Sequence, residues 1–324
     1  MINSAISTTR KERIPQIDYL KCIFILLMIA FHLVYFGDKY PYAKRIVYTF
    51  HMPVFLIISG YLVNIHKNVK DFLHIILWMF IPYAIMECGY TVMSAVLPVR
   101  DKVDSLSIGV IIKNVFVSPL GPYWYLQTLI ICNVTYYFIH KVGSKWSDIN
   151  RIICLSICLG SLAYWLHIMS LANVVYYIIG VVISMYGIPF LTFFKSSPLS
   201  ILPFIILCLF PGNLDKFSLS GVIITYLAIG IALSFYKYLT TPPCINKTIQ
   251  FIGRNTLIIL LFSPIFTIVA KVFIPFLAFD HTGICFLVIS EIFTVSGSLF
   301  VAYLMDKLKI SPFFFGKKEA LNHI

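Results

Sequence analysis

The sequence contains few charged residues for its length. Of its 324 residues, 12% are charged and 60% are apolar, whereas soluble domains carry roughly 25% charged residues. A soluble chain of this length would need more polar surface than this sequence supplies. The apolar residues form runs of about 20, the length that crosses a bilayer as a helix. We therefore exclude a soluble globular domain and expect an all-α, polytopic membrane protein.

The cysteines also lack any metal-binding or disulfide pattern. The chain has eight, none in a Cys-x-x-Cys pair, and seven of them fall inside apolar runs. Metal sites of cysteine and histidine need characteristic spacings, which are missing here. We interpret the cysteines as free thiols used in packing, and we expect no metal.

Nucleic-acid-binding motifs, internal repeats and linkers are missing as well. The net charge is +12, but the basic residues lie mainly between apolar runs, where topology and lipid headgroups explain them. We therefore expect the lipid bilayer and no nucleic acid as a partner, and a single domain over residues 1–324. The first apolar run holds Asp18 and Lys21 and has no small-residue cleavage site, so it predicts a retained span instead of a signal peptide.

The hydropathy pattern predicts ten transmembrane spans, of which the seventh is short enough to be re-entrant. The termini and the even-numbered connections hold twice as many Lys and Arg residues as the odd-numbered connections. This bias predicts a multi-pass protein of the cytoplasmic membrane with both termini in the cytoplasm. The predicted spans are Ile17–Phe36, Ile46–Asn64, Phe72–Leu97, Pro122–His140, Ile152–His167, Asn173–Phe194, Leu199–Phe210, Phe217–Leu239, Thr248–Leu277 and Gly283–Met305.

Three ionisable residues lie on one face of the first predicted span. Lys21 and His32 are eleven positions apart, about 1100° around a helix, which leaves an offset of only about 20°. Asp18 precedes Lys21 by three positions, so it faces the same way. His32 lies roughly 16 Å beyond Lys21 along the axis. Charges inside spans usually serve a function, although Asp18 and Lys21 could be a headgroup-level ion pair and His32 could be structural.

Other polar residues are expected at a similar depth. His51, Glu87 and Gln127 fall in the outer half of their predicted spans, near the depth of His32, and Glu291 lies slightly deeper. Their common depth predicts a polar cavity in the outer half of the bilayer. The alternative for each is a buried polar group that is satisfied by its neighbours.

Several stretches of the chain carry a family resemblance. "IDYLKCIFILLMIAFH" contains a basic residue followed by ten residues and a histidine, Lys21 and His32. "FHMPVFLIISGYL" follows, and Lys67 and Lys70 form a basic-x-x-basic motif. "YWYLQTLI" and "IGRNTLIILL" come later in the same order. In this ordered set the chain resembles the membrane-bound acyltransferase family 3, whose members include O-acetyltransferases of surface polysaccharides.

The sequence departs from the family pattern at three places. Lysines occupy the basic-x-x-basic motif where the family favours arginine. Lysine cannot bind a phosphate in the bidentate manner of arginine. The stretch "HIILWMFIPY" lacks the arginines often found before its Pro-Tyr, and Ser263 stands where many members carry histidine.

The resemblance implies transfer of an acyl group, usually acetyl from acetyl-CoA, to a sugar hydroxyl. Acetyl-CoA is then the acyl donor, and a saccharide is the acceptor. Lys67, Lys70 and Arg13 are candidates for binding the donor's phosphates. Lys21, between them and His32, is a catalytic candidate that could bind the donor or orient its carbonyl. No large outer domain is expected, because the longest outer connection, Pro98–Gly121, is short. The acceptor is therefore expected to be lipid-linked or a polymer near the membrane.

His32 is the candidate for proton transfer, or alternatively for carrying the acyl group covalently. Asp18 would fix Lys21 by pairing with it. Trp124 could stack on a sugar ring or could anchor a span end at the interface. The substrate-binding candidates are His51, Glu87, Trp124, Gln127 and Glu291. His51 or Glu87 could instead orient the imidazole of His32.

Two other classes of function remain open from the sequence. A secondary transporter or flippase for an anionic or lipid-linked solute would also use buried ionisable residues, but the chain has no repeated halves. A membrane scaffold would not need the aligned charges of the first span.

Overall fold

The computed structural model describes residues 13–96 and 102–323, and within these ranges its regular structure is entirely helical. Short 3-10 turns, including Gly121–Tyr123 and Pro198–Ser200, precede some of the helices. The helices are α1 (Pro15–His32), α2 (Val34–Gly37), α3 (Pro41–Leu62), α4 (Val69–Val96), α5 (Ile108–Phe116), α6 (Trp124–Val142), α7 (Asp148–Trp165), α8 (Leu171–Met185), α9 (Phe190–Phe193), α10 (Ile201–Cys208), α11 (Leu219–Thr240), α12 (Pro243–Arg254), α13 (Thr256–Val269), α14 (Ile274–Leu277), α15 (Ile284–Lys307) and α16 (Ser311–Phe315).

In the described part of the chain, six helical segments are long and apolar enough to cross a membrane. They are α1, α3, α4, α11, the segment Thr256–Leu277 and α15. A seventh arises if α5 and Gly121–Val142, which meet at a bend of 43°, count as one broken span. This is the architecture of a multi-pass membrane protein, and the expected number of ten spans is not confirmed.

The structure has fewer long helices than predicted spans because some apolar stretches of sequence continue after their helix has ended. The predicted sixth span, Asn173–Phe194, contains α8, which ends at Met185 after 15 residues. The predicted seventh span contains α10, which has 8 residues. At 1.5 Å per residue these helices reach about 22 and 12 Å, short of a hydrocarbon core of about 30 Å. The helix of the predicted fifth span, α7, is also not among the six.

Two predicted spans are interrupted in the structure. The first was expected to continue to Phe36, but α1 ends at His32 and Leu33 leaves the helical region before α2 begins. Neither glycine nor proline marks this break in the sequence. The ninth was expected from Thr248, but α12 ends at Arg254 and α13 starts at Thr256. The side chain of the intervening Asn255 donates to the Phe251 carbonyl, a local bond of the kind that competes with helix continuation.

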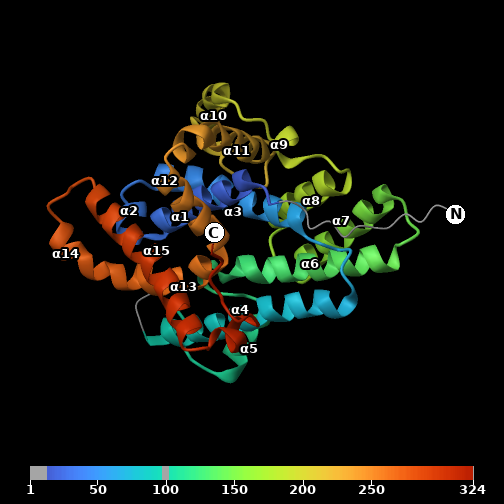
Figure 1. Cartoon of the computed structure of the whole chain (residues 1–324), viewed down its shortest axis with the longest axis horizontal. Helices are drawn as coiled ribbons and strands as arrows, with labels where there is room; N and C mark the ends of the chain where they lie inside the picture. Colours follow the sequence, from blue (N-terminus) through green and yellow to red (C-terminus); the bar gives the residue numbers. More distant parts are fainter. Residues whose placement is uncertain (1–12, 97–101, 324) are drawn as a thin grey trace.

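The helices α1 and α3 lie at the centre of the molecule, with α10–α12 on one side of them and α4–α6 on the other (Figure 1). In the spanning windows, 61% of α1 and 72% of α3 is buried, against 22% of α4. The main partner of α1 is α12, and the main partner of α3 is α8. These two helices, which are the most buried of the candidate spans, contribute lining residues to each of the three cavities described below.

The close approach of α3 and α8 depends on two glycines. A Cβ atom on Gly60 of α3 would lie 2.3 Å from the Tyr177 carbonyl oxygen, and one on Gly180 of α8 would lie 2.0 Å from the Ile57 carbonyl oxygen. Both distances are far below van der Waals contact with rigid backbone. Small residues at helix crossings are the usual means of bringing backbones together within a membrane.

We expect Gly180→Ala to destabilise the protein by about 1–3 kcal/mol, because its methyl group must push α3 and α8 apart. The matched control is Gly160→Ala on α7, where an added Cβ meets no atom within 4 Å. There the better helix propensity of alanine should leave stability unchanged or slightly raised. Thermal unfolding of both purified variants in detergent measures the difference, and equal melting temperatures would contradict the predicted packing role.

Candidate functional site

One face of α1 borders three cavities in succession. Lys21 and Ile25 line a cavity of about 410 Å³. Met28 and His32 line two further cavities, of about 340 and 670 Å³. Positions 21, 25, 28 and 32 repeat with helical spacing, so these four side chains share one face. The imidazole of His32 therefore faces these two cavities.

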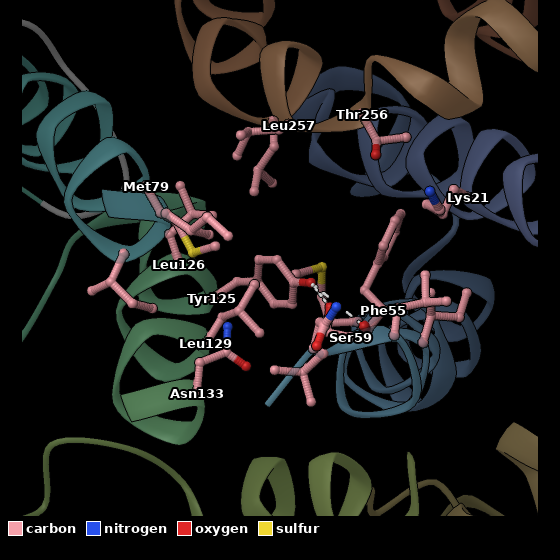
Figure 2. A pocket seen from close by; sticks show the side chains of 18 of the residues that line it. Lys21, Phe55, Ser59, Met79, Tyr125, Leu126, Leu129, Asn133, Thr256 and Leu257 are labelled. Carbon is pink, nitrogen blue, oxygen red and sulfur yellow. Dashed lines mark hydrogen bonds between the residues drawn. The ribbon is translucent and has the colours of Figure 1, made fainter. Parts of the chain in front are cut away.

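The first cavity, named here the Lys21 cavity, lies between α1, α3, α4, α6 and α13 (Figure 2). Its walls are mostly aliphatic and aromatic, and Lys21 projects at its edge near Thr256. Ser59 and Tyr125 form a hydrogen bond of 2.9 Å between their hydroxyls on its wall. Lys67 also lines the cavity. A mostly apolar space with cations on its border suits a long molecule that has an anionic end.

The two lysines of the basic-x-x-basic motif have different surroundings. Lys67 is half-buried and contributes to the wall of the Lys21 cavity. Lys70 is exposed in the first turn of α4 and does not line that cavity. The structure thus brings only one of the two beside Lys21.

Asp18 is the centre of a cluster of cations where α1 begins. Its buried carboxylate accepts from Lys21 Nζ at 2.8 Å and from Arg13 Nε at 2.5 Å. Arg254 Nε, from the end of α12, lies 3.8 Å from the same carboxylate. The Asp18 side chain is only 3% exposed, so its carboxylate lies within the protein. The backbone of α12 also lies against α1, because a Cβ on Gly253 would meet the Asp18 carbonyl oxygen at 1.9 Å.

The rings of His32 and His51 are oriented by their own helices. His32 Nδ1 is 2.7 Å from the Met28 carbonyl oxygen, and His51 Nδ1 is 2.8 Å from that of Val47. A carbonyl oxygen only accepts, so Nδ1 carries the hydrogen and the lone pair of the neutral ring is on Nε2. The ring centroids of the two histidines are 6.2 Å apart. Nε2 of His51 is buried and has no hydrogen-bond partner among the described residues.

Tyr48 packs beside both histidines. Its ring centroid is 5.5 Å from that of His32 and 5.1 Å from that of His51. Its hydroxyl donates to the Phe31 carbonyl oxygen at 3.2 Å. His32, Tyr48 and Lys44 line both of the cavities at this end of α1.

These two cavities differ in their remaining walls. The smaller, named the Ser263 cavity, reaches Ser263 and Lys271. The larger, named the Lys216 cavity, reaches His51, Trp124 and Lys216. Met52 lines both the Lys216 cavity and the Lys21 cavity, so a single side chain borders the spaces at the two ends of α1.

Three of the predicted substrate-binding residues line none of these cavities. Glu87 is fully buried on α4, and its Oε1 accepts from the Leu120 backbone N–H at 2.8 Å, which ties down the segment before α6. Gln127 is buried on α6, and neither of its amide atoms has a hydrogen-bond partner among the described residues. Glu291 is half-buried on α15. Their assignment to substrate binding stays a prediction.

Tyr48, Lys216 and Arg254 were not predicted from the sequence as residues of the site. Tyr48 precedes His51 by three positions on one helix, so helical spacing alone would have placed the two together. Arg254 lies within the recognised stretch "IGRNTLIILL" but was given no role. Lys216 lies in a connection, where spacing carries no information about the helices that it meets.

Comparison with known proteins finds one family. A family model described as an acyltransferase domain, that of acyltransferase family 3, matches residues 14–303. The match runs from α1 into α15 and so includes the walls of all three cavities. Neither the curated proteins nor the solved structures contain a significant match to the chain.

We expect Asp18→Asn to lower stability by about 2 kcal/mol, because it leaves several cations facing one another without their carboxylate. The effect should stay below that of a fully buried pair, because the Arg13 side chain is 52% exposed. The matched control is Asp148→Asn, which removes an exposed pair with Arg151 and should change stability by less than about 1 kcal/mol. Thermal unfolding measures both, and equal losses would show that Asp18 is not a structural centre.

Proposed function

We propose a reaction for this chain from the premise that it belongs to acyltransferase family 3 and is an acyltransferase. It transfers an acetyl group from acetyl-CoA to a hydroxyl of a cell-surface or lipid-linked saccharide. The observation that carries the proposal is the face of α1, on which Lys21 borders one cavity and His32 borders two others. Such a face gives donor and acceptor separate approaches to one imidazole. No observed contact favours the transporter or flippase that the sequence left open.

The donor would occupy the Lys21 cavity. Lys67 and Lys21 line it, and Arg13 lies beside Lys21 through their common partner Asp18. Cations at this end would bind the phosphates of CoA, which are strong acceptors. The mostly apolar walls would hold the uncharged arm that carries the thioester. That arm would have to cover roughly 16 Å along α1 to bring the thioester from Lys21 to His32.

His32 would act as the general base through Nε2. The acceptor oxygen attacks the thioester carbonyl carbon, a C–O bond forms, and the hydroxyl proton passes to Nε2. The C–S bond then breaks, and the departing thiolate takes the proton from Nε2. The hydrogen bond from Nδ1 to the Met28 carbonyl oxygen holds the tautomer that this step requires. In the covalent alternative Nε2 attacks the thioester carbon, the C–S bond breaks and the CoA thiolate departs. The acceptor oxygen then attacks the acetyl carbon, the C–N bond breaks, and the hydroxyl proton passes to the thiolate.

The acceptor would enter through the Lys216 cavity, which His32 and His51 both line. Tyr48 lies close to both rings, and its hydroxyl is a candidate for binding sugar hydroxyls. Asp18 would act at a distance, by keeping Lys21 at the edge of the donor space. Ser263 lies in the neighbouring cavity with His32, at the position where the resembling family often has histidine.

His32→Ala should reduce acetyl transfer by at least about 100-fold, because general bases contribute about 10²–10⁴-fold. Transfer is measured with purified protein, radiolabelled acetyl-CoA and a surface-glycan acceptor. His281→Ala is the control, since it removes an exposed histidine that lines none of the three cavities. A folded His32→Ala protein with near-normal transfer would remove this residue from the chemistry.

Lys67→Gln should raise the KM for acetyl-CoA about tenfold and leave the KM for the acceptor unchanged, because it removes a charged contact on the donor side only. Lys70→Gln should cause a smaller rise, since Lys70 does not line the Lys21 cavity. Steady-state kinetics with each substrate varied in turn separate the two constants. An equal rise in the KM for acetyl-CoA in both variants would contradict this placement of the donor. A rise confined to the KM for the acceptor would contradict it as well.

A further inference from the structure

The segment 208–216, which leads into α11, is bound tightly to the beginning of α3. Side chains at three positions of one face of α3 donate hydrogen bonds to successive carbonyl oxygens of this segment. They are Tyr42 to Cys208 at 2.5 Å, Arg45 to Pro211 at 2.9 Å and Thr49 to Leu214 at 3.2 Å. The Thr49 hydroxyl shares its hydrogen with the Arg45 carbonyl oxygen at 3.0 Å. Because α3 also carries Tyr48 and His51, these bonds fix the segment relative to the histidines.

Lys216, at the end of this segment, is held in place through its backbone. Its carbonyl oxygen accepts from the Tyr176 hydroxyl at 2.7 Å. The backbone of Asp215 and Lys216 also packs against Gly221, where an added Cβ would lie 2.2 Å from the Asp215 carbonyl oxygen. The side chain then extends over Trp124, with Nζ 5.4 Å from the ring centroid. Trp124 thus faces a cation, a favourable arrangement for an aromatic ring.

The ammonium group of Lys216 has no carboxylate partner within 4.0 Å among residues 13–96 and 102–323. The neighbouring Asp215 directs its carboxylate to the Phe217 backbone N–H at 2.9 Å. Burial lowers the pKa of Lys216, and Asp215 opposes this only in part. A half-buried cation without a counter-ion is unfavourable unless a ligand supplies the negative charge.

Cations also outnumber carboxylates along the path to His32. The Lys216 cavity is lined by Lys44, Arg45 and Lys216 against Asp38 and Asp215. Asp38 is already paired with Lys44 at 2.8 Å. The described residues that line the Lys216 cavity therefore carry more positive than negative charge.

We propose that the Lys216 cavity binds an anionic group of the acceptor, a carboxylate or a phosphate, between Lys216 and Arg45. This deepens the proposed function and rests on it, because it identifies the acceptor as a negatively charged saccharide. The anion anchors the acceptor at the rigid segment 208–216, and a hydroxyl elsewhere on the same molecule reaches His32. The charge belongs either to an acidic sugar or to the phosphate that links a sugar to a lipid carrier.

The test uses the full chain in nanodiscs of phosphatidylcholine and three acceptors with the same alkyl chain. They are a neutral glucoside, a glucuronide, and a glucosyl phosphate diester. Binding is measured without acetyl-CoA, and acetyl transfer is then measured in the same samples. At least one anionic compound should bind about tenfold more tightly than the glucoside, as expected for a charged hydrogen bond. The compound that is preferred identifies the sugar or the phosphate as the source of the charge.

Lys216→Gln should remove this preference, and Lys216→Arg, which keeps the charge, should retain most of it. Lys113→Gln is the matched control, because Lys113 is exposed on α5 and lines neither cavity. Equal binding of all three compounds by the unmodified protein, or a preference that survives Lys216→Gln, would overturn the inference. If the protein acetylates the acceptors but shows no preference for the anionic ones, this inference is overturned and the proposed function stands. Lys216-dependent anion binding without acetylation of any compound would instead overturn the proposed function.

Discussion

Asp18 is a buried carboxylate within an apolar helix, and the arrangement of the surrounding elements follows from the need to neutralise it. Its oxygens contact Lys21 and Arg13, and Arg254 approaches from α12. Arg254 in turn donates to the His323 carbonyl oxygen near the end of the chain. A single charge therefore connects α1 to α12 and to the C-terminal segment, and it fixes the amine that borders the Lys21 cavity. Unpaired, such a charge would be strongly unfavourable in a low-dielectric interior.

Each of the two histidine rings is bonded by its own helix. Each ring uses Nδ1 to bond the carbonyl four residues earlier on its own helix, so the position of Nε2 follows from local geometry. The surroundings of Nε2, in contrast, come from distant segments. Ser263 on α13, Trp124 on α6 and Lys216 before α11 complete the cavities around His32. The site thus combines locally oriented catalytic candidates with walls that assemble only when the helices pack.

The close packing of α3 against α8 helps to keep those walls in register. The glycine contacts between α3 and α8 bring two backbones close together, and the first turns of α3 hold the segment that ends at Lys216. A displacement of α3 would therefore move His51, Tyr48 and Lys216 together. This coupling keeps Lys216 in a constant position relative to Tyr48 and His51, whereas His32 is positioned separately by α1. Precise positions matter because rates of group transfer depend steeply on them.

The sequence by itself determined the class of protein and the common face of Lys21 and His32, because composition and helical period are properties of one segment. The motifs that carry the family resemblance are likewise local strings. Only the tertiary structure decided where apolar runs stop being helical, as α1 does at His32 and α8 at Met185. It also decided that Glu87 binds the backbone before α6 and that Lys216 covers Trp124. These facts depend on contacts between segments that are far apart in the chain. Such contacts cannot be predicted from the depth of a residue in the bilayer or from spacing along one helix.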